Sequence, residues 1–213
     1  MFQALQSYGW PMYVALSSQS LVNFINYVSF LFIPLIAIGN NLSLSEIAIL
    51  FAVMRVPYLV NILIGNVGDK YNKKILITLL ILAASVLFFL LGNAHSFPTI
   101  VAISFGLSLV VAIFQPIAAA LILGYAKSKD KGLIAGMQEF TGKIGEIVGS
   151  LGFGILTTIL GMHYAFQILG LGLFVLGAYL LTKKLLRYRT RDNEADKERK
   201  AHISYFQPKG TET

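Results

Sequence analysis

The chain has no cysteine and few charged residues. The absence of cysteine excludes disulfides and thiolate metal sites. Only 13% of the 213 residues are charged and 56% are hydrophobic, whereas an ordinary soluble domain has roughly 25% charged residues. A soluble core of this size could not bury so much apolar surface. The composition therefore indicates a membrane protein.

Features of enzymes and metal sites are also lacking. The three histidines, His95, His163 and His202, are scattered along the sequence, so we expect no metal site built from them. There is no phosphate-binding loop, nucleophile elbow or metal-ligand spacing. We therefore expect neither enzymatic activity nor a cofactor.

The hydrophobic residues form six long blocks with almost no charge. Blocks of about 18 residues or more are long enough to cross roughly 30 Å of hydrocarbon as helices, which satisfy their own backbone hydrogen bonds. The blocks do not alternate apolar and polar residues, which argues against a membrane barrel. The sequence thus predicts an all-α polytopic membrane protein with six transmembrane helices. They are placed at residues 12–38, 44–64, 75–91, 98–124, 132–160 and 164–181.

Basic residues predict the orientation and the boundaries. Between the blocks, Lys and Arg occur only in the second and fourth turns, and they follow again after the sixth block. Since cytoplasmic loops carry the excess of Lys and Arg, both termini are expected in the cytoplasm, with the cell membrane as the location. Residues 1–11 are predicted to be an interfacial lead-in, 12–186 the bundle in the lipid bilayer, and 187–213 a charged cytoplasmic tail. This topology explains the net charge of +7, so we expect no nucleic-acid partner.

The second turn carries a motif. It reads Gly65-Asn66-Val67-Gly68-Asp69-Lys70-Tyr71-Asn72-Lys73-Lys74. This resembles the signature that joins the second and third helices of a six-helix half in the major facilitator superfamily, with Asn72 in place of the usual glycine. The resemblance implies a cytoplasmic gating turn, although a basic loop without a gating role would also explain the lysines. The gating candidates are Gly65, Gly68, Asp69, Lys70, Lys73 and Lys74.

Small residues are concentrated in the fifth block. They recur four apart at Gly132/Gly136, Gly145/Gly149 and Ser150/Gly154, which favours close packing of membrane helices. The block is similar to the fifth or eleventh helix of the same family. The fourth block lacks the arginine of many amino-terminal halves, and Gly149-Ser150 stands where some show Gly-Pro, so the chain resembles a carboxyl-terminal half. The resemblance implies a second six-helix half as partner: a separate chain, a second copy or a missing part of the same protein.

Four charged residues lie well inside the blocks. They are Arg55, Glu139, Lys143 and Glu146. The last three share one helical face, and a packing that brought Arg55 near them would form a cluster without net charge. Charged groups at this depth face a partner or a cavity. Two interpretations stay open: a structural ion network, or a glutamate that binds a proton or an ion during transport.

Polar residues also follow one face of the first block. They are Gln19, Asn23, Asn26 and Tyr27. By resemblance this face lines a substrate cavity, and Gln115, next to a proline in the fourth block, is a further candidate. Hydrogen bonding between helices alone would also explain the stripe.

The resemblance implies a function. A protein of this family would be a secondary active transporter, or half of one, that moves a small solute by alternating access, with proton coupling as one option. The competing interpretation is a transport-inactive membrane partner, a regulatory or truncated half that assembles with other membrane proteins.

Overall fold

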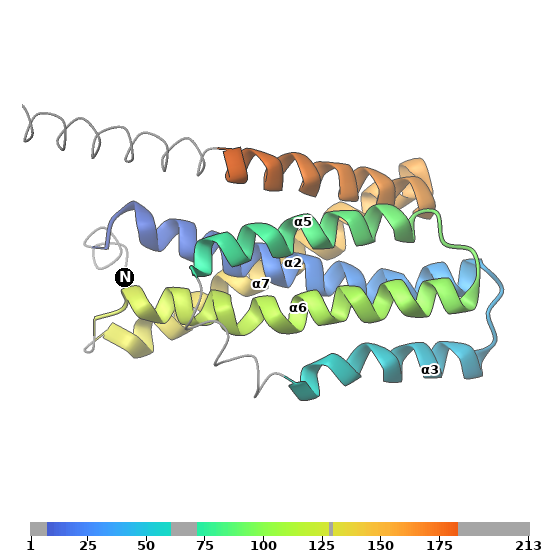
Figure 1. Ribbon diagram of the computed structural model, residues 1–213, viewed down its shortest axis with the longest axis horizontal. Helices are drawn as coiled ribbons and strands as arrows, with labels where there is room; N and C mark the ends of the chain where they lie inside the picture. The colour runs from blue at the N-terminus through green and yellow to red at the C-terminus, as the bar shows by residue number, and fades with distance from the viewer. Residues whose placement is uncertain (1–7, 61–71, 128–129, 183–213) are drawn as a thin grey trace, which may run out of the picture.

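The protein is a bundle of long helices. The computed structural model describes residues 8–60, 72–127 and 130–182. Its elements are α2 (Trp10–Gly39), α3 (Leu44–Arg55), the 3-10 helix η1 (Val56–Val60), α5 (Lys73–Leu91), α6 (Phe97–Tyr125), α7 (Lys131–Leu160) and a last helix, Met162–Thr182 (Figure 1). No strand occurs in these three stretches of chain. The predicted all-α class is confirmed.

Local sequence signals explain where several helices begin. Ser43 caps α3 in a capping box: its hydroxyl accepts from the Glu46 amide at 3.3 Å, and the Glu46 carboxylate accepts from the Ser43 amide at 2.8 Å. The Asn72 side chain caps α5 by accepting from the Lys74 amide at 3.1 Å. A proline in the first turn of α6, Pro98, needs no amide donor there. These signals agree with the predicted boundaries to within a few residues.

The second predicted span is divided. Its α-helix ends at Arg55 and continues as η1, which contains Pro57. Proline has no amide hydrogen and disfavours the α conformation of the residue before it, which explains the change. Residues 61–64, predicted as the end of this span, lie outside the described part of the chain.

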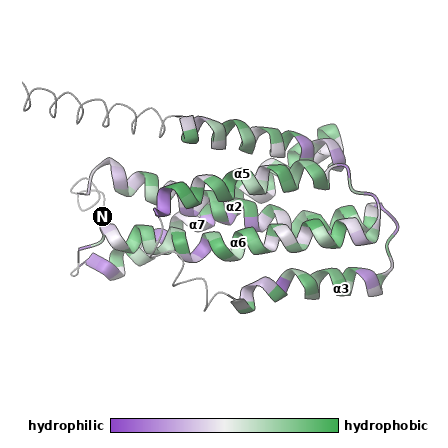
Figure 2. Ribbon diagram, viewed as in Figure 1, coloured by the Kyte–Doolittle hydropathy of each residue, from purple (hydrophilic) through white to green (hydrophobic). Residues whose placement is uncertain are grey.

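Five of the described helices are long and apolar enough to cross a membrane. They are α2, α5, α6, α7 and Met162–Thr182, with mean window hydropathies of 1.4 to 2.7. Hydrophobic residues cover most of their length, and hydrophilic residues gather at the turns (Figure 2). Because these helices leave large apolar side chains exposed, the protein is an integral membrane protein.

Helix α2 lies at the centre of the packing. It contacts α7 and α6 most extensively, and α5 packs along α6. The last helix lies against α5, where a β-carbon at Gly170 would come 2.6 Å from the Phe89 amide nitrogen. Phenylalanine rings from three helices meet in the core: Phe88 stacks on Phe166, which also contacts Phe153.

Glycines bring α2 and α7 together. A β-carbon at Gly145 would overlap the carbonyl oxygen of Ser20, and one at Gly149 would come 3.3 Å from the Phe24 carbonyl oxygen. The Gly145/Gly149 spacing therefore marks a real helix contact, as the sequence predicts. The Gly132/Gly136 pair does not take part, because nothing lies within 4 Å of a β-carbon at either position in the described bundle.

Candidate functional site

A series of amide contacts joins α2 to α7 inside the bundle. Gln138 Nε2 donates to Gln19 Oε1 at 3.4 Å, and Gln19 Nε2 donates to Asn23 Oδ1 at 3.1 Å. Asn23 Nδ2 then donates to Glu146 Oε1 at 3.5 Å. The close approach at the glycines makes these contacts possible, because Gln19 and Asn23 lie beside Gly142. The predicted polar stripe and the predicted charged face thus meet in one site.

The charged residues extend this site along α7. Lys143 Nζ donates to the two carboxylate oxygens of Glu146 at 3.1 and 3.0 Å, and it lies 3.7 Å from Glu139 Oε1. We call the whole set the α2–α7 network: Gln19, Asn23, Gln138, Glu139, Lys143 and Glu146. At about 1.5 Å per residue, Glu139, Lys143 and Glu146 lie roughly 12, 18 and 22 Å from the start of α7, well inside a bilayer.

Exposure increases from one end of the network to the other. Gln19 is buried, and the side chain of Glu146 is 20% exposed. The side chains of Lys143 and Glu139 are 57% and 72% exposed. The network therefore begins in the α2–α7 contact and opens onto the surface of the bundle.

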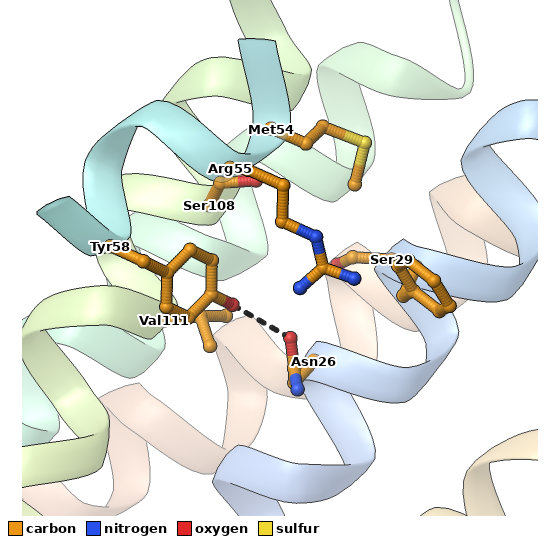
Figure 3. A pocket seen from close by; sticks show the side chains of 8 residues that line it. Asn26, Ser29, Met54, Arg55, Tyr58, Ser108 and Val111 are labelled. Atoms are coloured by element: carbon orange, nitrogen blue, oxygen red, sulfur yellow. Dashed lines mark hydrogen bonds between the residues drawn. The ribbon is translucent and has the colours of Figure 1, made fainter. Parts of the chain in front are cut away.

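Arg55 lies apart from this network. Its guanidinium is 4.6 Å from the ring centre of Phe30 and 5.9 Å from that of Tyr58. In Figure 3 it points toward Asn26, whose Oδ1 accepts a hydrogen bond from the Tyr58 hydroxyl at 2.9 Å. Within the described residues Arg55 has no carboxylate at ion-pair distance, so it forms no four-charge cluster with the residues of α7. The end of α3 packs against α6 and η1, which places Arg55 beside a different part of α2.

Arg55 borders a small hollow between α2, α3 and α6. The hollow is lined by Asn26, Ser29, Phe30, Met54, Arg55, Tyr58, Ser108 and Val111 (Figure 3). Ring faces attract the guanidinium, and the hydroxyl and amide groups around it are polar. The predicted polar stripe on α2 is therefore divided between two sites. Asn23 belongs to the α2–α7 network, and Asn26 lines this hollow.

The other predicted site residues belong neither to the α2–α7 network nor to the hollow. Tyr27 and Gln115 are half-buried, and within the described chain neither makes a side-chain hydrogen bond. Of the turn predicted to act as a gate, Gly65, Gly68, Asp69 and Lys70 lie outside the described residues. Lys73 and Lys74 begin α5, and Lys74 Nζ lies 5.9 Å from the ring centre of Tyr125 at the end of α6.

The sequence patterns did not identify two residues of the site, Gln138 and Tyr58. Gln138 lies four residues before Gly142 and one before Glu139, so the packed face of α7 could have been extended to include it. Tyr58 lies three residues after Arg55, beyond a proline that interrupts the helical spacing. No periodicity in the sequence would have placed its ring beside the guanidinium.

A polar contact joins the turn before α7 to the start of α2. The Tyr8 hydroxyl donates to Asp130 Oδ2 at 2.6 Å and accepts from the Lys127 amide at 3.3 Å. The hydrogen bond to Asp130 raises the pKa of Tyr8 above its ordinary value, because it stabilises the protonated phenol. Both segments lie at the same end of the bundle (Figure 1).

The fold and the site define a polytopic α-helical membrane protein with charged residues within its bundle. The sequence profile of the Major Facilitator Superfamily matches residues 15–210. The chain therefore belongs to this superfamily of transporters, as the motifs predict. Among curated proteins, no sequence matches the chain.

Proposed function

We propose that the chain is a six-helix half of a secondary active transporter, in which the α2–α7 network couples the movement of a small solute to a proton. The observation that carries this proposal is the charge of the network. It contains two carboxylates, Glu139 and Glu146, and one cation, Lys143. Helices α2 and α6 have no Asp, Glu, Lys or Arg, so neither supplies a second cation. The two carboxylates therefore share one cation among the described residues, which leaves the network with a net negative charge.

A net negative charge at this depth is energetically unfavourable. Charged groups in the membrane pair with one another or face a water-filled cavity, and the idealised penalty for an isolated ion is many kcal/mol. Binding a proton neutralises one carboxylate and removes this penalty. A network that changes between a charged and a neutral state is what proton coupling requires.

The exposure of Glu139 and Lys143 supports a second half. Acyl chains cannot solvate these charges, so this face of α7 needs water or polar protein beside it. In the proposal a second six-helix half closes the cavity, and the two halves rock about it by alternating access. The second half would be a separate chain, a second copy or a further part of the same protein. Both ends of the chain would lie in the cytoplasm, and the cell membrane would be its location.

Proton coupling is tested by transport at different pH values. The protein is reconstituted in liposomes that contain a pH-sensitive dye, alone and with its second half, and a panel of small solutes is screened for flux. Glu146→Gln and Glu139→Gln each remove one titratable group, and at least one of them should make transport independent of pH. Glu46→Gln is the matched control, because within the described residues the Glu46 side chain hydrogen-bonds only to its capping partner Ser43. Unchanged pH dependence in both network variants would contradict the coupling.

The cavity is tested separately by cysteine labelling, for which the chain has no background thiol. Gly136→Cys and Ser150→Cys flank the charged face of α7. Ile144→Cys and Leu151→Cys lie on its exposed apolar face, where the native side chains are 43% and 64% exposed. A membrane-impermeant thiol reagent should label the first pair and spare the second. Equal labelling of both pairs would contradict a polar cavity on the charged face.

The alternative function is a transport-inactive membrane partner. It is favoured if liposomes with the protein, alone and with its second half, show no more solute flux than protein-free liposomes. In that case the α2–α7 network would serve only to hold the helices together.

A further inference from the structure

The structure brings together two histidines that are far apart in the sequence. His95 lies in the turn between α5 and α6, and His163 lies in the first turn of the last helix. Their ring centres are 4.8 Å apart, with the ring planes at 39°. The two segments meet at one end of the bundle (Figure 1). The spacing of these histidines in the sequence gave no reason to expect this contact, and within the described residues no group of three or more metal-ligating side chains occurs.

The separation of the rings suits a shared metal ion. Zinc binds imidazole nitrogens at about 2.0–2.1 Å with tetrahedral angles, which places the centres of two ligand rings about 5 Å apart. The observed 4.8 Å is close to this distance. His95 is exposed and His163 is half-buried, so an ion from the surrounding water could reach both.

The hydrogen bond of His163 leaves its second nitrogen available. His163 Nδ1 lies 3.0 Å from the carbonyl oxygen of Gly92. A carbonyl oxygen can only accept, so Nδ1 carries the hydrogen, and in the neutral ring Nε2 keeps its lone pair. Histidine ligands of metals are commonly oriented in this way, by donation from the other nitrogen to a carbonyl.

The backbone around the pair is held in place. A β-carbon at Gly92 would come 2.6 Å from both the His163 carbonyl oxygen and Gln167 Cγ, so the turn touches the last helix directly. Gln167 Nε2 also donates to Asn93 Oδ1 at 3.0 Å. These contacts hold the turn that carries His95 against the helix that carries His163, which lowers the entropy lost on binding.

We propose that His95 and His163 form a binding site for a divalent transition-metal ion that ties the turn between α5 and α6 to the last helix, with water completing the coordination. Imidazole ligands favour copper, nickel and zinc over magnesium, which prefers oxygen. With two protein ligands the site would be weaker than a structural four-ligand site.

Zinc binding to the purified full chain tests the site. Titration calorimetry with Zn²⁺ in detergent, without chelators, should show one ion per chain, and Zn²⁺ should raise the melting temperature. Mg²⁺ at the same concentration should leave it unchanged. His95→Gln and His163→Asn should each weaken Zn²⁺ binding by roughly tenfold or more. The Asn amide can still donate to the Gly92 carbonyl, so the second variant removes the ligand and keeps the hydrogen bond.

His202→Gln is the matched control and should bind Zn²⁺ as the parent does. Should His163→Asn melt lower than the parent without metal, His95→Gln decides the test, because His95 makes no hydrogen bond within the described chain. The proposal is overturned if the parent binds no Zn²⁺, if both site variants bind it as well as the parent does, or if the loss occurs in His202→Gln instead. These results do not depend on transport.

Discussion

The contact between α2 and α7 gives the sharpest prediction, at Gly145. In Gly145→Ala the new methyl group would overlap the Ser20 carbonyl oxygen and come within 2.8 Å of its carbonyl carbon. These are backbone atoms, so they cannot rotate away. Restoring ordinary contact at 3.4 Å to the carbonyl carbon alone requires the helices to separate by roughly 0.6 Å, and the closer carbonyl oxygen requires more. The hydrogen bond from Asn23 to Glu146, already 3.5 Å long, would then be lost.

Gly152→Ala is the matched control on the same helix. Nothing lies within 4 Å of a β-carbon there, so only the higher helix propensity of alanine acts, and it stabilises by up to about 1 kcal/mol. The same gain applies at Gly145, so the difference between the two variants isolates the overpacking. Overpacking destabilises by about 1–3 kcal/mol, which corresponds to a difference in melting temperature of roughly 2–12 °C for a chain of this size.

The assay is thermal unfolding in detergent. Unfolding is measured as the loss of the fraction that stays monodisperse on gel filtration. Gly145→Ala should melt lower than the parent, and Gly152→Ala should melt at the parent temperature or above. Equal melting temperatures for the two variants would refute the close approach of α2 and α7 at Gly145.

Three further predictions concern single contacts. Ser43→Ala removes the cap of α3 and should lower the free energy of unfolding by about 0.5–2 kcal/mol in the same assay; no change would mean that the cap does not stabilise the helix. Asn26→Leu leaves the Tyr58 hydroxyl without its acceptor and should destabilise by roughly 0.6–1.7 kcal/mol, whereas a gain in stability would contradict the role of this bond. The raised pKa of Tyr8 means that its bond to Asp130 contributes fully below pH 10.0 and is lost as the pH rises through the raised value. Stability should therefore fall more steeply above pH 10.0 in the parent than in Tyr8→Phe, and parallel pH profiles would contradict this.

The sequence predicted the helices well because length and hydropathy are local properties. Blocks without charge must be helical in lipid, and capping residues such as Ser43 and Asn72 mark where two of the helices begin. The Gly145/Gly149 spacing also predicted a close contact, because two small residues four apart let two helix backbones approach each other. The same spacing at Gly132/Gly136 makes no such contact within the described bundle, because spacing alone does not say which face of α7 meets α2.

The site was predicted only within each helix. The contact of Lys143 with Glu139 and Glu146 follows from the helical repeat. Whether Arg55 lies near these residues depends on how three helices pack against one another, which no local sequence pattern specifies. The structure places Arg55 beside Phe30 and Tyr58 instead. The meeting of His95 and His163 depends on two turns coming together, so it could not be predicted for the same reason.

The order of groups along the α2–α7 network limits the route that a proton could take. Asn23 and Gln19, which connect Glu146 to the buried side, are amides that neither gain nor release a proton near neutral pH. In the proposed coupling, a proton bound at Glu146 would therefore find no carboxylate or basic group on α2 to move to. It would enter and leave on the side where Lys143 and Glu139 are exposed, so the proposed coupling predicts a site open to one side of α7 and not a proton path through α2.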